Sequence, residues 1–183
     1  MKNQFFLIGL IGVFLVFSIA IKFANGIMAG SITTFLIFLL VIIFLTIGIK
    51  SFFNKQLNKL SIIFIVFSNM IWTFSTIAIY FKIQLFPNSN LLLSISLAGI
   101  VLNFIFYFRE DLKNSIPSLY KNIGIPIVFL IFIISLLFVP SNTLIDIYYR
   151  NDLKQGELIK KMVAEPNNKE IIQEVEDYQR IKN

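Results

Sequence analysis

The chain of 183 residues contains no cysteine and no histidine. This absence excludes disulfide bonds, thiol nucleophiles, zinc sites built from cysteine or histidine, histidine-ligated haem and imidazole acid–base catalysis. The sequence also has no P-loop, no G-x-S-x-G nucleophile motif and no glycine-rich phosphate cradle. We therefore expect no cofactor and no metal centre.

Charged residues are scarce as well, at 14% of the chain, whereas hydrophobic residues make up 57% and the mean hydropathy is +0.81. Soluble domains average about 25% charged and roughly 45–50% apolar residues. The apolar residues gather in runs that are too long for the core of a soluble domain. The composition therefore predicts an integral membrane protein.

Five apolar runs have the roughly 17–25 residues that a helix needs to cross a bilayer core of about 30 Å, and they cover residues 5–21, 27–49, 60–81, 91–108 and 123–139. Only helices satisfy the backbone of such runs in lipid, and the short connections between them predict antiparallel neighbours. The predicted fold class is all-α: a polytopic membrane protein with five transmembrane helices in an antiparallel bundle over residues 1–139. Residues 140–183 form a separate C-terminal amphipathic helical hairpin.

The first run has a second interpretation as a cleaved signal peptide, because it follows Lys2 and precedes Ala20 and Ala24. It is longer than the usual 7–15-residue apolar region of a signal peptide, and no clear A-x-A site follows it. We therefore favour a membrane span, and both interpretations stay open at this point.

The net charge of +6 does not indicate a nucleic-acid partner, because the lysines stand mainly at the ends of the apolar runs, where they set orientation. With the N-terminus in the cytoplasm, the inner segments carry seven basic residues and the outer segments four. The inner set is Lys2, Lys50, Lys55, Lys59, Arg109, Lys113 and Lys121, and the outer set is Lys22, Lys82, Arg150 and Lys154. We expect a bacterial protein of the cell (inner) membrane, with the lipid bilayer as partner and the C-terminal tail outside or in the periplasm.

Polar residues inside the runs are uncharged and share helical faces. One face of 60–81 and one face of 91–108 are predicted to meet, and the candidate site residues there are Asn69, Trp72, Thr73, Ser96 and Asn103. One interpretation is a packing seam, in which small and amide side chains hold two helices together. The other is a ligand groove lined by Asn69, Trp72 and Asn103.

The tail carries two apolar stripes at helical spacing on either side of a break at Pro166, and Gly156 is predicted to interrupt the first helix. The basic first arm is expected to attract the acidic second arm. One interpretation is a solvated hairpin that lies on its own membrane domain. The other is a docking element for a protein partner, because about 44 residues bury little surface alone; its candidate partner-binding residues are Leu158, Met162, Ile172, Val175 and Tyr178.

Carboxylates occur only outside the predicted spans. Glu110 and Asp111 follow Arg109, as helix-capping groups usually do, and Asp146 is expected to pair with Arg150 one turn later. A membrane enzyme would need such carboxylates to converge on a divalent ion.

Three function classes follow. The leading one is a non-enzymatic accessory or assembly protein whose tail contacts a partner. The second is a small transporter or ligand sensor that uses the seam between the third and fourth spans. The third is a membrane enzyme with carboxylates at the interface. The lack of any carboxylate within the spans argues against proton-coupled antiport.

Overall fold

A computed structural model of the chain describes residues 29–109 and 124–182, together with Ile11, Gly12, Phe14, Ile19 and Ile21. Within these residues the protein is entirely helical, with seven helices and no strand. The predicted all-α class is confirmed at this level. Most of the first predicted span and the connection that holds Glu110 and Asp111 lie outside the described residues.

Three long helices correspond to the second, third and fourth predicted spans: α2 (Ala29–Phe52), α3 (Lys59–Ile83) and α4 (Ser89–Tyr107). With a rise of 1.5 Å per residue, their lengths are about 36, 37 and 28 Å, close to or above the thickness of a bilayer core. Each is long and apolar enough to cross a membrane. This finding indicates a membrane protein with several apolar helices.

The fifth predicted span is shorter in the structure than its apolar run. Helix α7 (Gly124–Phe138) has 15 residues, or about 22 Å, and Pro140 separates it from α8 (Ser141–Tyr148). The apolar part of α7 and α8 meet at an angle of 87°. The described residues thus contain three helices long and apolar enough to cross a membrane, or up to four if this bent pair forms one span, so five spans are not established.

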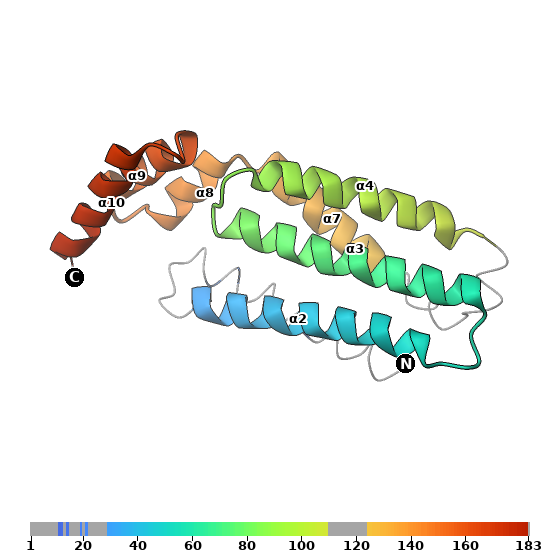
Figure 1. Ribbon diagram of the computed structural model, residues 1–183. Coiled ribbons are helices and arrows are strands. Elements are labelled where there is room, and N and C mark those ends of the chain that lie inside the picture. The colour runs from blue at the N-terminus through green and yellow to red at the C-terminus, as the bar shows by residue number, and fades with distance from the viewer. Residues whose placement is uncertain are drawn as a thin grey trace.

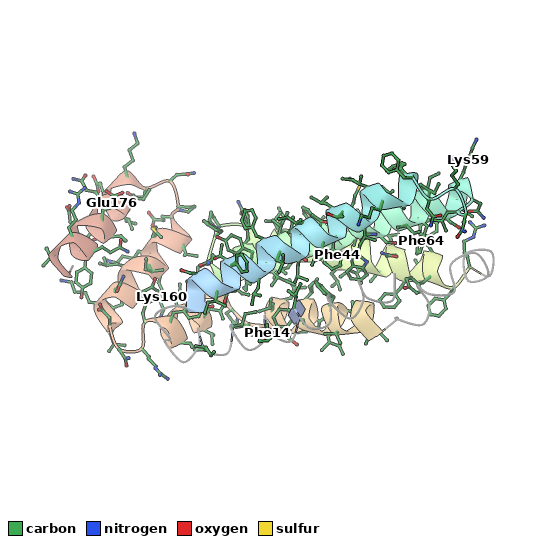
Figure 2. The ribbon with its side chains drawn as sticks, turned by 90° about the horizontal axis from the view of Figure 1, so that it is seen from below. Phe14, Phe44, Lys59, Phe64, Lys160 and Glu176 are labelled. Atoms are coloured by element: carbon green, nitrogen blue, oxygen red, sulfur yellow. The ribbon has the colours of Figure 1, made fainter. Side chains whose placement is uncertain are left out.

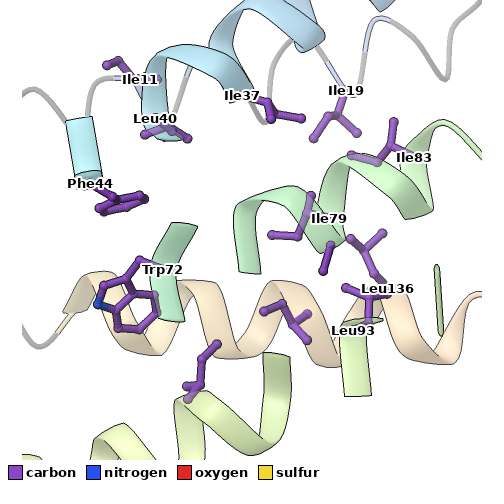
Figure 3. Packing of buried hydrophobic residues seen from close by; sticks show 13 residues of the cluster. Ile11, Ile19, Ile37, Leu40, Phe44, Trp72, Ile79, Ile83, Leu93 and Leu136 are labelled. Atoms are coloured by element: carbon purple, nitrogen blue, oxygen red, sulfur yellow. The ribbon is translucent and has the colours of Figure 1, made fainter. Parts of the chain in front are cut away.

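Helix α3 lies at the centre of the bundle. It packs against α2 on one side and against α4 on another, and α7 lies behind α3 and α4 in Figure 1. The main hydrophobic cluster joins α2, α3, α4 and α7, and it includes Ile11 and Ile19 from the first apolar run. Figure 3 shows how these side chains converge on the space between the helices.

The tail is built from α8 followed by α9 (Leu153–Ala164) and α10 (Lys169–Lys182). The predicted break at Pro166 is present, because α9 ends before it and α10 begins after it. The prediction that Gly156 interrupts a helix is wrong: Gly156 lies in the first turn of α9, and the interruption lies between α8 and α9. A Cβ atom on Gly156 would lie 3.2 Å from Tyr149 Cβ, so glycine here permits close packing.

The tail and the α2–α3 connection lie at opposite ends of the molecule. Figure 2 shows Lys59 at one end and Lys160 and Glu176 at the other. The α3–α4 connection lies at the tail end, as Figure 1 shows. The basic residues Lys50, Lys55 and Lys59 are therefore separated from the tail by the length of the bundle.

We predict that Gly156→Val loosens α9 from the preceding turn, because the added side chain meets Tyr149 at less than contact distance. Overpacking of this kind costs about 1–3 kcal/mol, partly offset by a better helix propensity. Limited proteolysis of the tail should become faster. Glu157→Val, at the exposed neighbouring position, is the control and should leave the rate unchanged; equal rates for both variants would contradict the prediction.

Candidate functional site

Two side-chain hydrogen bonds join the two helices of the predicted seam. Ser68 Oγ on α3 donates to Asn103 Oδ1 on α4 over 3.1 Å, and both side chains are buried. At the tail end of the same pair, Lys82 Nζ donates to Asn90 Oδ1 over 2.7 Å. These two contacts fix the antiparallel register. Ser75 and Ser96 each lie seven residues from the Ser68–Asn103 bond, so they lie at the same depth.

This register reveals a seven-residue repeat that the sequence interpretation missed. Small or polar buried residues recur on both helices: Ser61, Ser68, Ser75 and Lys82 on α3, and Ser89, Ser96 and Asn103 on α4. A spacing of seven keeps one stripe in contact with a neighbouring helix over its whole length. The repeat is visible in the sequence, but it is hard to recognise because many other polar residues share the same broad face at 100° per residue.

The predicted groove residues do not face one space. Asn69 Nδ2 donates to Ile65 O of its own helix, and Asn69 Cβ lies 3.5 Å from where a Cβ on Gly48 of α2 would be. The ring of Trp72 contacts Phe129 of α7 edge-on, with 5.4 Å between centroids. Asn103 belongs to the contact between α3 and α4. Asn69 therefore contacts α2 and Trp72 contacts α7, whereas Asn103 lies at the contact between α3 and α4.

Trp72 is part of an aromatic cluster in the core. Phe129 also contacts Phe44 of α2, at 6.1 Å between centroids, and Trp72 itself is only 8% exposed. Figure 3 shows the Trp72 ring between Phe44 and α7. Edge-to-face pairs of this kind add about 0.5–1.5 kcal/mol beyond the area they bury. The position of Trp72 thus matches a role in joining α2, α3 and α7.

The remaining seam residues are also packed within the bundle. Ser96 Oγ donates to Leu92 O of its own helix. Thr73 Oγ1 and Asn103 Nδ2 are buried, and no hydrogen-bond partner lies within reach of either. The Ile71 side chain of α3 packs directly against the backbone of Gly99, where a Cβ atom would lie 3.4 Å from Ile71 Cγ2. Small side chains and close contact favour the packing interpretation over a ligand groove.

Lys82 is the unexpected residue of this region. The sequence placed it at the membrane interface as an anchor, but its side chain is fully buried, with 0% exposure. Its ammonium group donates to Asn90 of α4 and to Ser141 Oγ of α8, the latter over 3.4 Å. No described carboxylate pairs with it. Lys82 therefore connects the end of α3 to the beginnings of α4 and α8.

The α3–α4 connection holds the tail at a second point. Leu85 has a positive φ of 61°, which is unusual for a residue with a branched side chain. Its side chain packs against the tail cluster of Ile145, Leu158, Ile159 and Val175. Tertiary packing that over-determines a residue can hold such a strained backbone in place. The tail is thus docked on the bundle.

Four of the five predicted partner-binding residues of the tail lie in or against this same cluster, and the fifth, Ile172, lines the groove along α10. Leu158 and Val175 are buried, and Met162 and Tyr178 pack against them; Ile172 is half-buried. The two arms meet as a hairpin, with Lys154 Nζ 5.1 Å from the centre of the Tyr178 ring and Tyr178 Oη donating to Asp152 Oδ1 over 3.0 Å. Much of the apolar surface of both stripes is therefore already covered within the chain.

Two carboxylates at the start of the tail, Asp146 and Asp152, have structural partners. Asp146 forms an ion pair with Lys160 of α9, whereas the sequence predicted a pair with Arg150. The reason is that α8 ends at Tyr148, so Arg150 is not one helical turn away on the same helix. Asp152 caps α9 by accepting from Gln155 N. Nowhere in the part of the chain that the structure describes do three acidic residues gather as metal ligands would.

The fold and site thus define an all-helical protein whose long apolar helices are suited to a membrane. Comparisons with known proteins found no family model, no curated protein and no solved structure that matches the chain. The function must therefore be inferred from the chain's own geometry.

We predict that the seam depends on small volume more than on hydrogen bonding. Ser75 Oγ is buried without a partner, so Ser75→Ala should change the free energy of unfolding by less than about 0.5 kcal/mol. Ser75→Leu should destabilise the protein by about 1–3 kcal/mol, because it forces α3 and α4 apart. Thermal unfolding in detergent micelles measures both. Ser94→Leu, at an exposed position of α4, is the volume-matched control; a large loss with Ser75→Ala would contradict the prediction.

We also predict that Lys82→Met loosens the attachment of α8 to the end of α3. The partners of Lys82 reach water once the ammonium group is gone, because Asn90 is exposed and Ser141 is half-buried. A hydrogen bond to a charged group contributes about 1.5–3 kcal/mol, so hydrogen–deuterium exchange of α8 amides should become about tenfold faster. Amides in the middle of α3 should be unaffected. Lys59→Met at the other end is the control, and unchanged exchange in α8 would show that Lys82 does not hold it.

Proposed function

We propose that the protein is a non-enzymatic accessory or assembly protein of a bacterial inner membrane, and that its C-terminal tail contacts a protein partner. In this proposal the chain crosses the membrane five times, the N-terminus is cytoplasmic and the tail is extracytoplasmic. The separation of Lys50, Lys55 and Lys59 from the tail by the length of the bundle supports this orientation, because basic residues favour the cytoplasmic side.

The observation that carries the proposal is that the tail is a folded unit attached to the bundle at two points. Its apolar cluster is closed by α8, α9 and α10, and Leu85 and Lys82 attach it to the bundle. A surface that is ordered before binding loses less conformational entropy when a partner arrives. This geometry suits display of a binding surface better than it suits catalysis or transport.

The surface available to a partner is the outer face of α10. It carries exposed Glu170, Glu174, Glu176 and Asp177, and a shallow groove of about 260 Å³ runs along it between Gln173, Glu176, Asp177, Arg180 and their neighbours. Arg180 is close to Glu176 and Asp177, with nitrogen–oxygen distances of 4.0 Å. Exposed pairs at this distance are weak, so a partner can displace them. A basic helix or segment complements this face.

The two other function classes receive less support. A transporter or ligand sensor needs the groove residues to line one cavity, but Asn69, Trp72 and Asn103 face different neighbours of α3. An enzyme with interfacial carboxylates needs them to converge, but Asp146 pairs with Lys160 and Asp152 caps α9.

Site-specific photo-cross-linking in intact cells tests the proposal. A photoreactive residue at Gln173 should give a discrete protein adduct, and the same residue at lipid-facing Phe35 should not. Adding Glu176→Lys and Asp177→Lys should reduce the Gln173 adduct at least fivefold, because both changes reverse the charge of the face. The matched control is the pair Glu157→Lys on α9 and Glu165→Lys at the C-cap of α9, which changes the net charge equally.

A Gln173 adduct that survives the α10 changes, or that the α9 changes reduce as much, would contradict contact through α10. A failure to obtain any discrete adduct from exposed positions of α9 and α10 would contradict a protein partner at the tail.

A further inference from the structure

The end of the molecule opposite the tail carries an unusual charge pattern. The first 109 residues contain no aspartate and no glutamate. Three lysines of this stretch gather within ten positions, at Lys50, Lys55 and Lys59, where α2 ends and α3 begins. All three side chains are exposed. No acidic side chain therefore lies nearby in sequence to neutralise the α2–α3 connection.

This connection has a defined local structure. Phe53 N donates to Lys50 O and Asn54 N donates to Ser51 O, which continues α2 into a turn. Asn58 Oδ1 accepts from Ser61 N over 2.7 Å and caps α3. Leu57 packs inward against a small cluster of Phe64, Ile65 and Tyr107. The connection therefore holds its outward side chains in fixed directions.

Two aromatic side chains of the connection are exposed, unlike Leu57. Phe52 is 62% exposed and Phe53 is 80% exposed, and they stand between Lys50 and Lys55 in the sequence. Leu57, the other large apolar residue of the connection, is turned inward. Exposed phenyl rings are costly in water, but at a bilayer surface they enter the acyl region while neighbouring lysines reach the phosphates.

We propose that the α2–α3 connection is a binding surface for anionic glycerophospholipids of the leaflet that it faces. Phe52 and Phe53 insert below the headgroups, and Lys50, Lys55 and Lys59 contact the phosphate and glycerol oxygens. Because α2 ends here and α3 begins here, two helices that cross the bilayer in this proposal place the lysines at the depth of the lipid headgroups. Juxtamembrane lysine clusters bind anionic lipid in this way.

Other partners fit the surface less well. A nucleic acid would match the lysines, but it would leave the two phenyl rings in water unless its bases were single-stranded. The next connection on the proposed cytoplasmic side has three basic residues, Arg109, Lys113 and Lys121, and two acidic residues, Glu110 and Asp111. Its net charge, counted from the sequence, is therefore also positive. The proposal is independent of the partner at the tail.

A fluorescent reporter in the full-length protein tests the proposal. Phe53→Trp is reconstituted in vesicles that contain either acyl-brominated phosphatidylglycerol or acyl-brominated phosphatidylcholine at equal mole fraction. The native Trp72 is buried in the core, and the spectrum of the parent protein serves to subtract it. Quenching should indicate about fivefold or greater enrichment of the anionic lipid at low salt, and 0.5 M salt should reduce this enrichment.

Two variants of the Phe53→Trp reporter, each lacking three lysines, show which lysines bind the anionic lipid. Lys50→Gln, Lys55→Gln and Lys59→Gln together should bring the enrichment close to onefold. Lys154→Gln, Lys161→Gln and Lys169→Gln in the tail remove the same charge and should leave it unchanged. Equal quenching by both lipids in the parent reporter, no quenching by either lipid, or an equal loss with the tail variant would each overturn the proposal.

Discussion

The bundle depends on how closely other helices can approach α3. In lipid the hydrophobic effect does not drive helices together, so contact between small side chains and backbones supplies much of the association. The serine stripe of α3 and Gly99 of α4 permit this approach on one side. Gly48 permits it on the α2 side, next to Asn69. The aromatic contact of Trp72 with α7 fills the space where no small residue occurs.

The helices and their ends were largely predictable from the sequence, whereas the neighbours of each face were not. Apolar runs, and turn residues such as Pro140 and Pro166, mark the limits of α2, α3, α4 and the tail helices. Helical periodicity also gives the direction of a side chain around its own axis. It does not say which helix lies in that direction. The sequence pattern therefore predicts that Asn69 and Trp72 contact α4, whereas in the structure they contact α2 and α7.

Lys82 and Gly156 show a second limit of sequence interpretation. A lysine after an apolar run usually extends to the interface, and a glycine usually weakens a helix. Both rules describe a helix in isolation. In the folded protein three helix ends converge on Lys82 and bury it, and the turn after α8 presses Tyr149 against α9 so closely that only glycine fits without a shift. These roles arise from contacts between different helices and the turns that join them.

The contacts that attach the tail also connect the two ends of the molecule through α3. Lys82 lies in the last turn of α3 and Leu85 in the connection that follows, and α3 continues without a break to Lys59 at the opposite end. A continuous helix behaves as a stiff element over this distance, so a displacement of one end is carried to the other end when the bundle moves as a body. In our proposal the lysine-rich connection binds the bilayer surface, and the contact of Lys82 with Ser141 joins the tail to the bundle. On that proposal the fold itself sets the position of the α10 face relative to the membrane, whereas a flexible tether would leave it variable.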